Sequence, residues 1–358
     1  MRQKEQQRLQ TTLLDWYDVH GRPLAWRVKN GPGDPYRVWL SEIMLQQTTV
    51  VTVGPYYKEF LRRWPTLEAL AKADMDEVLH AWQGLGYYAR ARNLHKCARI
   101  LVAEYGGCFP DNEKQLLTLP GVGAYTAAAI AAIAFGCQSA PVDGNIVRVV
   151  SRLMKLHTPL PGLCREVAEK FAPLVAQERP GDFVQAMMDL GSMVCTPRNP
   201  DCEQCPWNTA CAAFKAGAAE GLPVKAAKKQ KPTRYGIIFW TEDPGGKIML
   251  RRRDEKGLLG GMMEFPSTPW REQGWVLDEA IKEAPVTTSW RALPGSVRHT
   301  FTHFHLELTV LVGRIRGKHA EQSIWCTPEC FADYALPTVM KKVSQHVFQA
   351  AYPGVQND

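Results

Sequence analysis

Four cysteines lie close together in the chain and could bind a metal. Cys195, Cys202, Cys205 and Cys211 follow the spacing C-x6-C-x2-C-x5-C within 17 residues, and three prolines between them disfavour a helix. Thiolates this close in sequence are expected to bind one centre, and they select zinc or iron–sulfur clusters. Structural zinc sites more often have two paired C-x2-C units, whereas this segment has one. The spacing therefore favours an iron–sulfur cluster, leaves zinc as the alternative, and is compatible with a purely structural role.

A glycine turn between two predicted helices could bind phosphate. Residues 112–119 are predicted to be helical, the sequence Leu-Pro-Gly-Val-Gly interrupts them, and an alanine-rich helix is predicted for 124–135. Gly121 and Gly123 permit a tight turn and leave backbone N–H groups exposed at a helix N-terminus, where a phosphate oxygen can bind. An ordinary helical hairpin is the alternative. The sequence Val-Asp-Gly-Asn-Ile-Val-Arg at 142–148 strengthens the functional interpretation.

The elements that must position these residues form two regions of different character. Residues 8–215 have apolar residues at helical spacing and little strand-like alternation. Residues 217–232 form a predicted linker, because their lysines follow one another with neither an acid between them nor a helical apolar face. Beyond the linker, an α+β domain is predicted. Its expected strands are 235–240, 247–250 and 304–312, and its expected helices are 276–283 and 339–350.

Composition and charge exclude several protein classes. With 45% apolar residues in 358 and no low-complexity segment, the chain is neither disordered nor fibrous. Its longest apolar run, residues 125–137, is too short for a membrane span, and no signal sequence is recognisable, so we expect a reducing compartment. Of the net charge of +7, +6 lies in residues 1–231, where 28 basic residues outnumber 22 acidic ones. This excess favours nucleic acid only modestly.

With further motifs added, the sequence resembles the adenine DNA glycosylases of the MutY type, in the helix-hairpin-helix superfamily of base-excision repair enzymes. The motifs are WLSEIMLQQT (39–48), GLGYYARARNLH (84–95), LPGVGAYTAAAI (119–130), VDGNIVRV (142–149), the cysteine spacing and FTHFHL (301–306). The resemblance implies a multidomain protein. An all-α helix-hairpin-helix glycosylase domain would span 1–216, with its hairpin at about 112–135, and an α+β Nudix-like domain would span 233–358. The loop 195–211 would hold a [4Fe–4S] cluster.

Excision of adenine makes two demands that carboxylates can meet. The departing base must be protonated, and the oxocarbenium-like sugar requires a nearby negative charge. Glu42, in a predicted helix among apolar neighbours, should have a raised pKa, and the resemblance assigns it the protonation of adenine at N7. Asp143, also a candidate helix N-cap, would stabilise the sugar cation, and Asn145 would orient it. Tyr125 stands where strand-cutting relatives carry lysine, which implies a monofunctional enzyme with Tyr125 hydrogen-bonding near the sugar or Asp143.

The resemblance also assigns residues to the adenine pocket and to DNA. The pocket residues would be Arg22, Leu24, Trp26, Gln185 and Met188. The side-chain amide of Gln185 can pair with the N6/N7 edge of adenine. The residues near DNA would be Gln46, Gln47, Thr48, Tyr87, Tyr88, Arg90, Arg92, Gly121 and Gly123. The glutamine and tyrosine pairs would wedge into the duplex beside the flipped base, with ordinary surface roles as their alternative, and the two arginines would contact phosphates.

In the C-terminal domain, the resemblance implies that Phe301, Thr302 and His303 read 8-oxoguanine in the opposite strand. Many family members have serine at position 302, so the methyl group of Thr302 could alter selectivity. Nucleotide pyrophosphohydrolysis is the competing function of such a domain. However, the R-E-U-x-E-E metal-binding sequence does not follow residues 257–266, so the sequence favours lesion recognition.

The expected partner is double-stranded DNA with adenine opposite 8-oxoguanine or guanine, bound by a monomer in the cytoplasm, at the nucleoid and without a membrane. One alternative is a bifunctional glycosylase/lyase of the endonuclease III kind, which Tyr125 disfavours. The other is a noncatalytic iron–sulfur DNA-binding protein, which the presence of both Glu42 and Asp143 disfavours.

Overall fold

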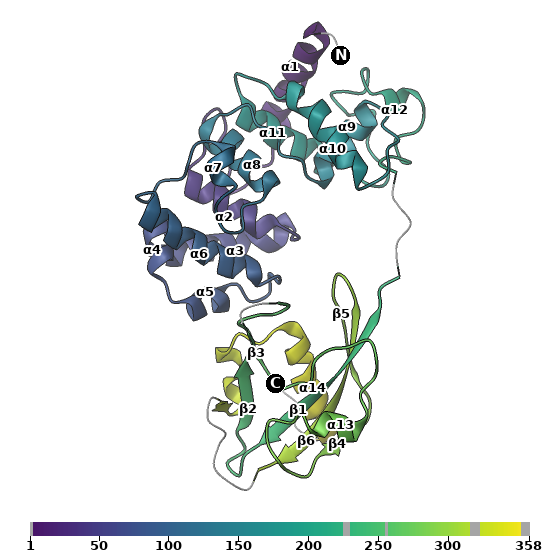
Figure 1. The fold of residues 1–358 in the computed structure, drawn as a ribbon. Coiled ribbons are helices and arrows are strands. Elements are labelled where there is room, and N and C mark those ends of the chain that lie inside the picture. Colours follow the sequence, from purple (N-terminus) through teal and green to yellow (C-terminus); the bar gives the residue numbers. More distant parts are fainter. Residues whose placement is uncertain (1–2, 225–229, 255–256, 316–322, 352–358) are drawn as a thin grey trace. The chain divides into compact units, whose positions relative to one another are not determined.

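The chain forms two compact units, of which the computed structural model describes residues 3–224, 230–254, 257–315 and 323–351 (Figure 1). Unit 1 consists of Met1–Ala73 and Arg92–Ala227, and unit 2 of Asp74–Ala91 and Lys228–Asp358. No helix within the described ranges is long and apolar enough to cross a membrane.

Unit 1 is helical, as the apolar spacing predicted. Its elements are α1 (Gln3–His20), α2 (Pro35–Leu45), α3 (Val50–Arg63), α4 (Leu67–Lys72), α6 (Ala89–Glu104, whose first residues belong to unit 2), α7 (Glu113–Leu116), α8 (Ala124–Phe135), α9 (Gly144–Leu153), α10 (Gly162–Phe171), the 3₁₀ turn η1 (Ala172–Leu174), α11 (Pro180–Asp189), the π-helical turn η2 (Leu190–Val194) and α12 (Ala212–Lys215).

Helix α8 forms the centre of unit 1. It is buried along nearly its whole length, from Thr126 to Ala134, and it packs against α2 and α11. A helix that is apolar on all sides is stable only when neighbours cover every face. Gly136 ends it in the left-handed conformation, with φ 67°. The predicted alanine-rich helix is therefore confirmed with the predicted bounds.

Two aspartates fix the starts of the helices that carry the predicted catalytic acids. The Asp34 side chain accepts a hydrogen bond from the Arg37 backbone N–H at 2.9 Å, and Pro35 occupies the first position of α2. Asp143 caps α9 in the same way, through the Ile146 N–H at 2.7 Å. Helix α2 thus presents Glu42 on its last turns, while Asp143 stands just before α9.

Unit 2 is built on a mixed sheet, in agreement with the predicted α+β class. Its elements are α5 (Met75–Ala81), β1 (Thr233–Glu242), β2 (Ile248–Arg252), β3 (Met263–Glu264), α13 (Leu277–Ile281), β4 (Arg291–Ala292), β5 (Val297–Thr300), β6 (His305–Arg314), β7 (Ile324–Cys326), the 3₁₀ segment η3 (Pro328–Asp333) and α14 (Thr338–Ala351). The strand order is β3-β2-β1-β6-β4, with β5 paired to β6 and β7 paired to β2. Strands β1 and β6 run parallel, from Thr233 opposite His305 to Glu242 opposite Arg314.

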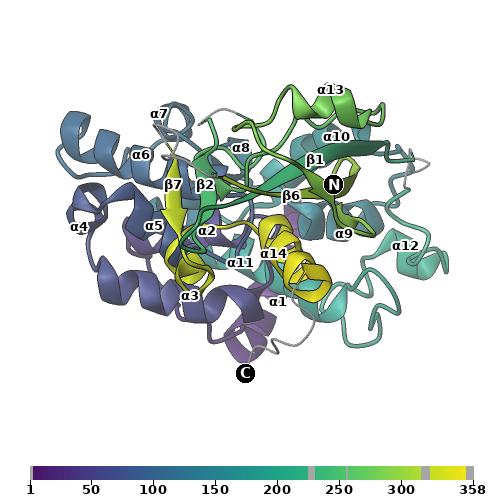
Figure 2. The same ribbon diagram turned by 90° about the horizontal axis from the view of Figure 1, so that it is seen from below.

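Alternate residues of β1 face different helices. Ile238 and Trp240 pack in a core with Val343 and Val347 of α14, which Figure 2 shows in yellow beside β6. Ile237 and Phe239 point the other way and pack with Ala280 of α13. The period of two expected for a strand therefore explains why both faces of the sheet are apolar and covered.

Residues 74–91 pack with unit 2, although the sequence placed them in the first domain. Arg252 donates two hydrogen bonds of 2.9 Å to the carboxylate of Asp76. The Gln83 side chain donates to the Tyr334 carbonyl at 3.0 Å. These contacts are far apart in sequence, and local periodicity carries no signal for them.

The first part of the predicted linker is folded onto unit 1. Ala219 and Leu222 are buried with Ala213. The Leu222 carbonyl accepts a hydrogen bond of 3.0 Å from Nε of the buried Arg152. Residues 225–229, with three of the linker lysines, lie outside the described residues.

Candidate functional site

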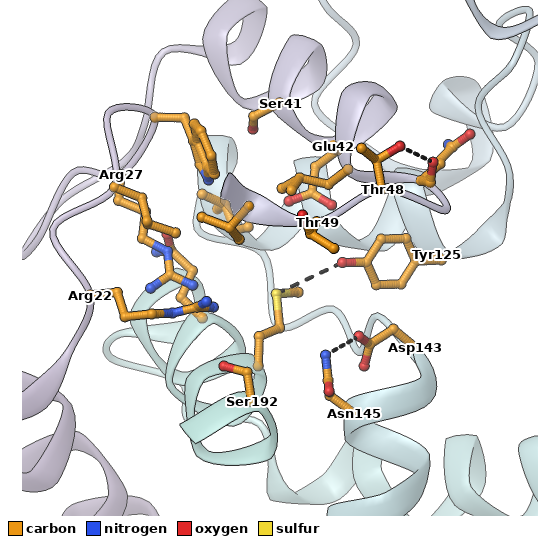
Figure 3. A pocket seen from close by; sticks show the side chains of 18 of the residues that line it. Arg22, Arg27, Ser41, Glu42, Thr48, Thr49, Tyr125, Asp143, Asn145 and Ser192 are labelled. Atoms are coloured by element: carbon orange, nitrogen blue, oxygen red, sulfur yellow. Dashed lines mark hydrogen bonds between the residues drawn. The ribbon is translucent and has the colours of Figure 1, made fainter. Parts of the chain in front are cut away.

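Unit 1 encloses a cavity of about 740 Å³ that gathers all nine predicted catalytic and adenine-pocket residues and three of the predicted DNA-contacting residues (Figure 3). The predicted residues that line it are Arg22, Leu24, Trp26, Glu42, Gln46, Gln47, Thr48, Tyr125, Asp143, Asn145, Gln185 and Met188. They come from α2, α8, α11, the N-terminus of α9 and the segment after α1, so folding joins positions more than 160 residues apart.

Glu42 is a buried acid on the wall of this cavity. Its exposed fraction is only 6%, and burial raises its pKa from 4.5 to about 7. Among the smaller influences included in this value, a hydrogen bond from Tyr125 and the charge of Arg27 lower the pKa, and the charge of Asp143 raises it. Glu42 can therefore be protonated at neutral pH, as a general acid must be.

The Tyr125 hydroxyl is directed towards Glu42 and α11. It donates to Met188 Sδ at 3.8 Å and interacts with the Glu42 carboxyl. Burial, followed by the charges of Glu42 and Asp143, raises the Tyr125 pKa well above its ordinary value. The phenol therefore stays neutral and acts as a hydrogen-bond donor.

Asp143 is held in one orientation from two sides. Its Oδ1 accepts from the Ile146 backbone N–H at 2.7 Å, and its Oδ2 accepts from Asn145 Nδ2 at 2.8 Å. Burial raises its pKa, and these hydrogen bonds with the charge of Arg148 lower it. Figure 3 shows the Asp143 and Asn145 pair at the edge of the cavity. The arrangement supplies a buried carboxylate that is oriented by donors, which suits the stabilisation of a nearby cation.

Arg148 connects this pair to the cysteine loop, a role that the sequence analysis missed. It donates to Asn145 Oδ1 at 2.8 Å, to the Gly191 carbonyl at 2.5 Å and to the Cys195 carbonyl at 2.6 Å. Arg148 belongs to the motif VDGNIVRV and lies three residues after Asn145, one turn along α9. That spacing was the available signal.

The four predicted ligand cysteines have the character expected of a cluster site. All four are free thiols and partly buried. Burial, together with the charges of its three partner cysteines, raises the pKa of Cys205 to about 12, so the four sulfurs lie near one another. Arg152 donates to Cys195 Sγ at 3.3 Å. Buried thiolates require a compensating metal centre, and the donor set fits an iron–sulfur cluster.

A second missed feature is a buried ion-pair group at the cavity. Asp189, at the end of α11, is fully buried and contacts Arg22 at 2.7 Å and Arg27 at 2.5 Å. Both arginines line the cavity, and Figure 3 shows them side by side. Asp189 follows Gln185 by four residues and shares its face of α11, which was the sequence signal for it.

The remaining pocket side chains are held by local contacts. The Trp26 ring meets Tyr57 edge to face, with ring centroids 5.3 Å apart. Gln185 is 3% exposed and donates to the Gly181 carbonyl at 3.1 Å. Gln46 donates to Thr126 Oγ1 at 3.2 Å.

Two parts of the backbone near the cavity adopt unusual conformations. Gln47 has φ 58°, a left-handed conformation that is uncommon for a residue with a side chain and is found often at functional sites. Gly121 has φ 77°, and a Cβ atom there would meet Asn93 Cβ at 2.8 Å. Gly123 precedes α8, and a Cβ atom there would meet nothing within 4 Å. The turn therefore needs glycine at 121, whereas the space at 123 is open and the predicted phosphate contact there stays a prediction.

The tyrosine and arginine positions after α5 differ from the sequence expectation. Tyr87 is 50% exposed with φ 49°, whereas Tyr88 is only 8% exposed. Arg90 is 9% exposed and donates to the Leu85 carbonyl at 2.9 Å, and burial lowers its pKa to about 10. In this placement Arg90 supports the preceding glycine turn, and its contact with phosphate stays a prediction. Arg92, in unit 1, is half-buried.

The proposed lesion-reading residues form a tight turn in unit 2. The Phe301 N–H donates to the Phe304 carbonyl at 2.9 Å, and the Phe301 ring stacks on Trp270 with centroids 5.8 Å apart. Thr302 and His303 are exposed, and Thr302 Oγ1 lies 2.5 Å from the Tyr87 hydroxyl. Of the predicted residues outside the cavity, Tyr87 and Thr302 are thus brought together.

Three family models match separate parts of the chain. Residues 40–173 match the HhH-GPD superfamily of base excision DNA repair proteins. Residues 195–211, the span of the four cysteines, match the iron–sulfur binding domain of endonuclease III. Residues 237–346 match the NUDIX domain. The helical and sheet-containing units thus have the fold families that the sequence predicted.

Full-length comparisons agree with these matches. The human adenine DNA glycosylase is 36% identical, over 96% of this chain and 74% of its own. The adenine DNA glycosylase of Buchnera aphidicola subsp. Baizongia pistaciae is 30% identical, over 93% of this chain and 94% of its own. A solved thermostable thymine-DNA glycosylase is 31% identical with a TM-score of 0.53, covering 60% of this chain and 98% of its own. An endonuclease III bound to DNA, at 24% identity and a TM-score of 0.51, shares the fold over 61% of this chain and 99% of its own.

Proposed function

The chain belongs to the family of adenine DNA glycosylases, and on this premise we propose that it excises adenine paired with 8-oxoguanine, or with guanine, from double-stranded DNA. It is a base-excision repair glycosylase with an iron–sulfur binding domain and a Nudix-like domain. The observation that carries the proposal is one cavity with two differently held carboxyl groups, Glu42 and Asp143. We also propose that it acts as a monomer where the chromosome lies, in the cytoplasm at the nucleoid.

In the proposed reaction, the target adenosine is flipped out of the duplex into the cavity. Glu42, with a pKa of about 7, is protonated in a large fraction of molecules at neutral pH and donates its proton to N7 of adenine. The base then leaves as a neutral molecule, and the bond to the sugar breaks. Gln185, from α11, is the candidate for pairing with the adenine edge.

Asp143 supplies the negative charge that the sugar cation requires. Its two hydrogen bonds, from Asn145 and the Ile146 N–H, favour the ionised form against the effect of burial. After the base leaves, water adds to the sugar, and the Glu42 carboxylate accepts the proton of that water. Tyr125 has no amine to attack the sugar, so the strand stays intact at the abasic site.

The cysteine loop and unit 2 have supporting roles. A [4Fe–4S] cluster would be bound by Cys195, Cys202, Cys205 and Cys211 and would hold the cysteine loop in one conformation. The Cys195 carbonyl accepts a hydrogen bond from Arg148, which in turn donates to Asn145, so a fixed loop would also help to hold Asn145. In unit 2, the turn with Phe301 and the exposed Thr302 is proposed to read 8-oxoguanine.

Product analysis tests the proposal. A duplex with adenine opposite 8-oxoguanine is incubated with the purified protein, and strand cleavage is read before and after alkali. We expect cleavage after alkali only, together with release of free adenine, and no reaction with thymine opposite 8-oxoguanine. Cleavage without alkali would indicate a lyase, and binding without any product would indicate a noncatalytic DNA-binding protein.

A further inference from the structure

Both carboxylate oxygens of Asp189, close to the cavity, accept hydrogen bonds from arginines, and no step of the proposed reaction involves this residue. Its Oδ1 accepts from Arg22 Nε at 2.7 Å, and its Oδ2 accepts from the Arg22 backbone N–H at 3.0 Å and from Arg27 Nη1 at 2.5 Å. Its side chain is 0% exposed, and that of Arg27 is 6% exposed. Such a group costs desolvation energy, so mere stability is a weak explanation for it.

The position of the arginines gives the ion-pair group a relation to the proposed acid. Arg22 and Arg27 line the same cavity as Glu42, whereas Asp189 does not line it. The charge of Arg27 reaches Glu42 and favours its carboxylate form. A guanidinium stays protonated in proteins, so this influence cannot be removed by loss of a proton. Only an opposing charge or a change in orientation can limit it.

The other ionisable groups that act on Glu42 are few. Tyr125 comes from α8, Asp143 from the N-terminus of α9, and Arg27 from the segment after α1. Tyr125 is neutral throughout the working range, and Asp143 favours protonation of Glu42. Arg27 is thus the cation that opposes protonation of Glu42, and Asp189 is its partner.

We propose that Asp189 is a positioning residue for acid catalysis: it holds Arg27 by a buried ion pair and neutralises its charge, so that Glu42 remains protonated when adenine is excised. This inference rests on the proposed function. Because Arg22 takes the other oxygen of the same carboxylate, Asp189 also fixes the relative placement of the two arginines on the cavity wall.

The inference makes a specific prediction for Asp189→Asn. The substitution removes one negative charge and leaves Arg27 uncompensated in the cavity that Glu42 also lines. The charge of Arg27 favours the Glu42 carboxylate, so we expect the midpoint of the high-pH limb of single-turnover excision to fall, by about one pH unit at most. The limb at low pH, where Asp143 must be ionised, should move much less.

A double-mutant cycle separates the electrostatic role from a merely structural one. Arg27→Gln should raise the midpoint, and it should raise it more in the Asp189→Asn background than in the wild-type protein. Asp182→Asn is the matched control, because Asp182 is also buried on α11 but pairs with Arg179 and does not line the cavity. The control should leave the midpoint in place. Equal effects of Arg27→Gln in both backgrounds, or an unchanged midpoint in Asp189→Asn, would overturn the inference.

A direct titration of Glu42 covers the case of inactive variants. The carboxyl infrared band is followed against pH in DNA-free protein with isotope-labelled glutamate, after subtraction of the Glu42→Gln spectrum. We expect the same order of midpoints as in the kinetic cycle. If the wild-type protein did not excise adenine, the proposed function would fail while this titration still tested Asp189. If Asp189→Asn did not fold, a lowered Glu42 midpoint in Arg27→Gln would still contradict the inference, because removal of a cation and exposure of the Asp189 charge should favour protonation of Glu42.

Discussion

Replacing Glu42 by glutamine tests whether burial raises the Glu42 pKa, because the substitution removes the ionisable group and keeps the size of the side chain. The Glu42 pKa is about 7 in the folded protein and 4.5 in its ordinary state. One pKa unit corresponds to about 1.4 kcal/mol, so ionising Glu42 within the fold costs about 3 kcal/mol relative to the unfolded chain.

The direction of the pH dependence follows from the raised pKa. Below pH 4.5, Glu42 is protonated in both states and costs nothing. As the pH rises towards 7, the unfolded chain ionises more readily than the folded protein, so the wild-type protein loses stability over this window. The gain in unfolding free energy from Glu42→Gln should therefore grow to about 3 kcal/mol above pH 7 and vanish below pH 4.5.

Denaturant unfolding at pH 4.5 and pH 8, followed by circular dichroism, measures this difference. Glu104→Gln serves as the matched control, because Glu104 is an exposed glutamate at the end of α6. We expect no pH-dependent difference for the control. A Glu42→Gln protein no more stable at pH 8 than at pH 4.5, relative to wild type, would refute the claim that burial raises the Glu42 pKa.

Three further substitutions test other parts of the site. Tyr125→Lys should form an adduct with abasic-site DNA that borohydride traps, because a buried lysine loses its proton readily and position 125 faces the proposed sugar site. Absence of the adduct would contradict this placement. Cys205→Ser should lose iron and colour while the exposed Cys164→Ser keeps both, and equal iron contents would contradict the ligand assignment. Tyr87→Phe removes the hydrogen bond to Thr302, which corresponds to about 1 kcal/mol. We therefore expect the preference for 8-oxoguanine over guanine, measured by competitive excision, to fall about fivefold. An unchanged preference would show that this contact has no role in reading the lesion.

Patterns that are local in sequence predicted the elements around the site well. The glycine pair and the alanine run predicted the bounds of α8, because Pro-Gly interrupts the preceding helix and alanine strongly favours the start of a new one. The capping role of Asp143 was likewise visible in the sequence. The apolar neighbours of Glu42 indicated its raised pKa, since residues around it on α2 face the core.

Contacts between distant segments were the part that the sequence could not predict. The burial of Arg90 depends on the left-handed turn before it, and the pairing of Asp189 with Arg27 joins residues 162 positions apart. Tyr125 turned towards Met188 and Glu42 because α8 and α11 are adjacent in space. No periodicity within one segment encodes these neighbours. Resemblance to a family predicts which residues belong to the site, but it does not predict the hydrogen bonds that those residues make.

The central claim is that Glu42 and Asp143 together perform the excision in one cavity. Single-turnover kinetics with adenine opposite 8-oxoguanine, compared for the wild-type protein, Glu42→Gln and Asp143→Asn, test it most directly. We predict a loss of at least about 100-fold in rate for each variant, with affinity for the same duplex unchanged within about threefold. Full activity in either variant, or a loss explained by weakened DNA binding, would contradict the claim.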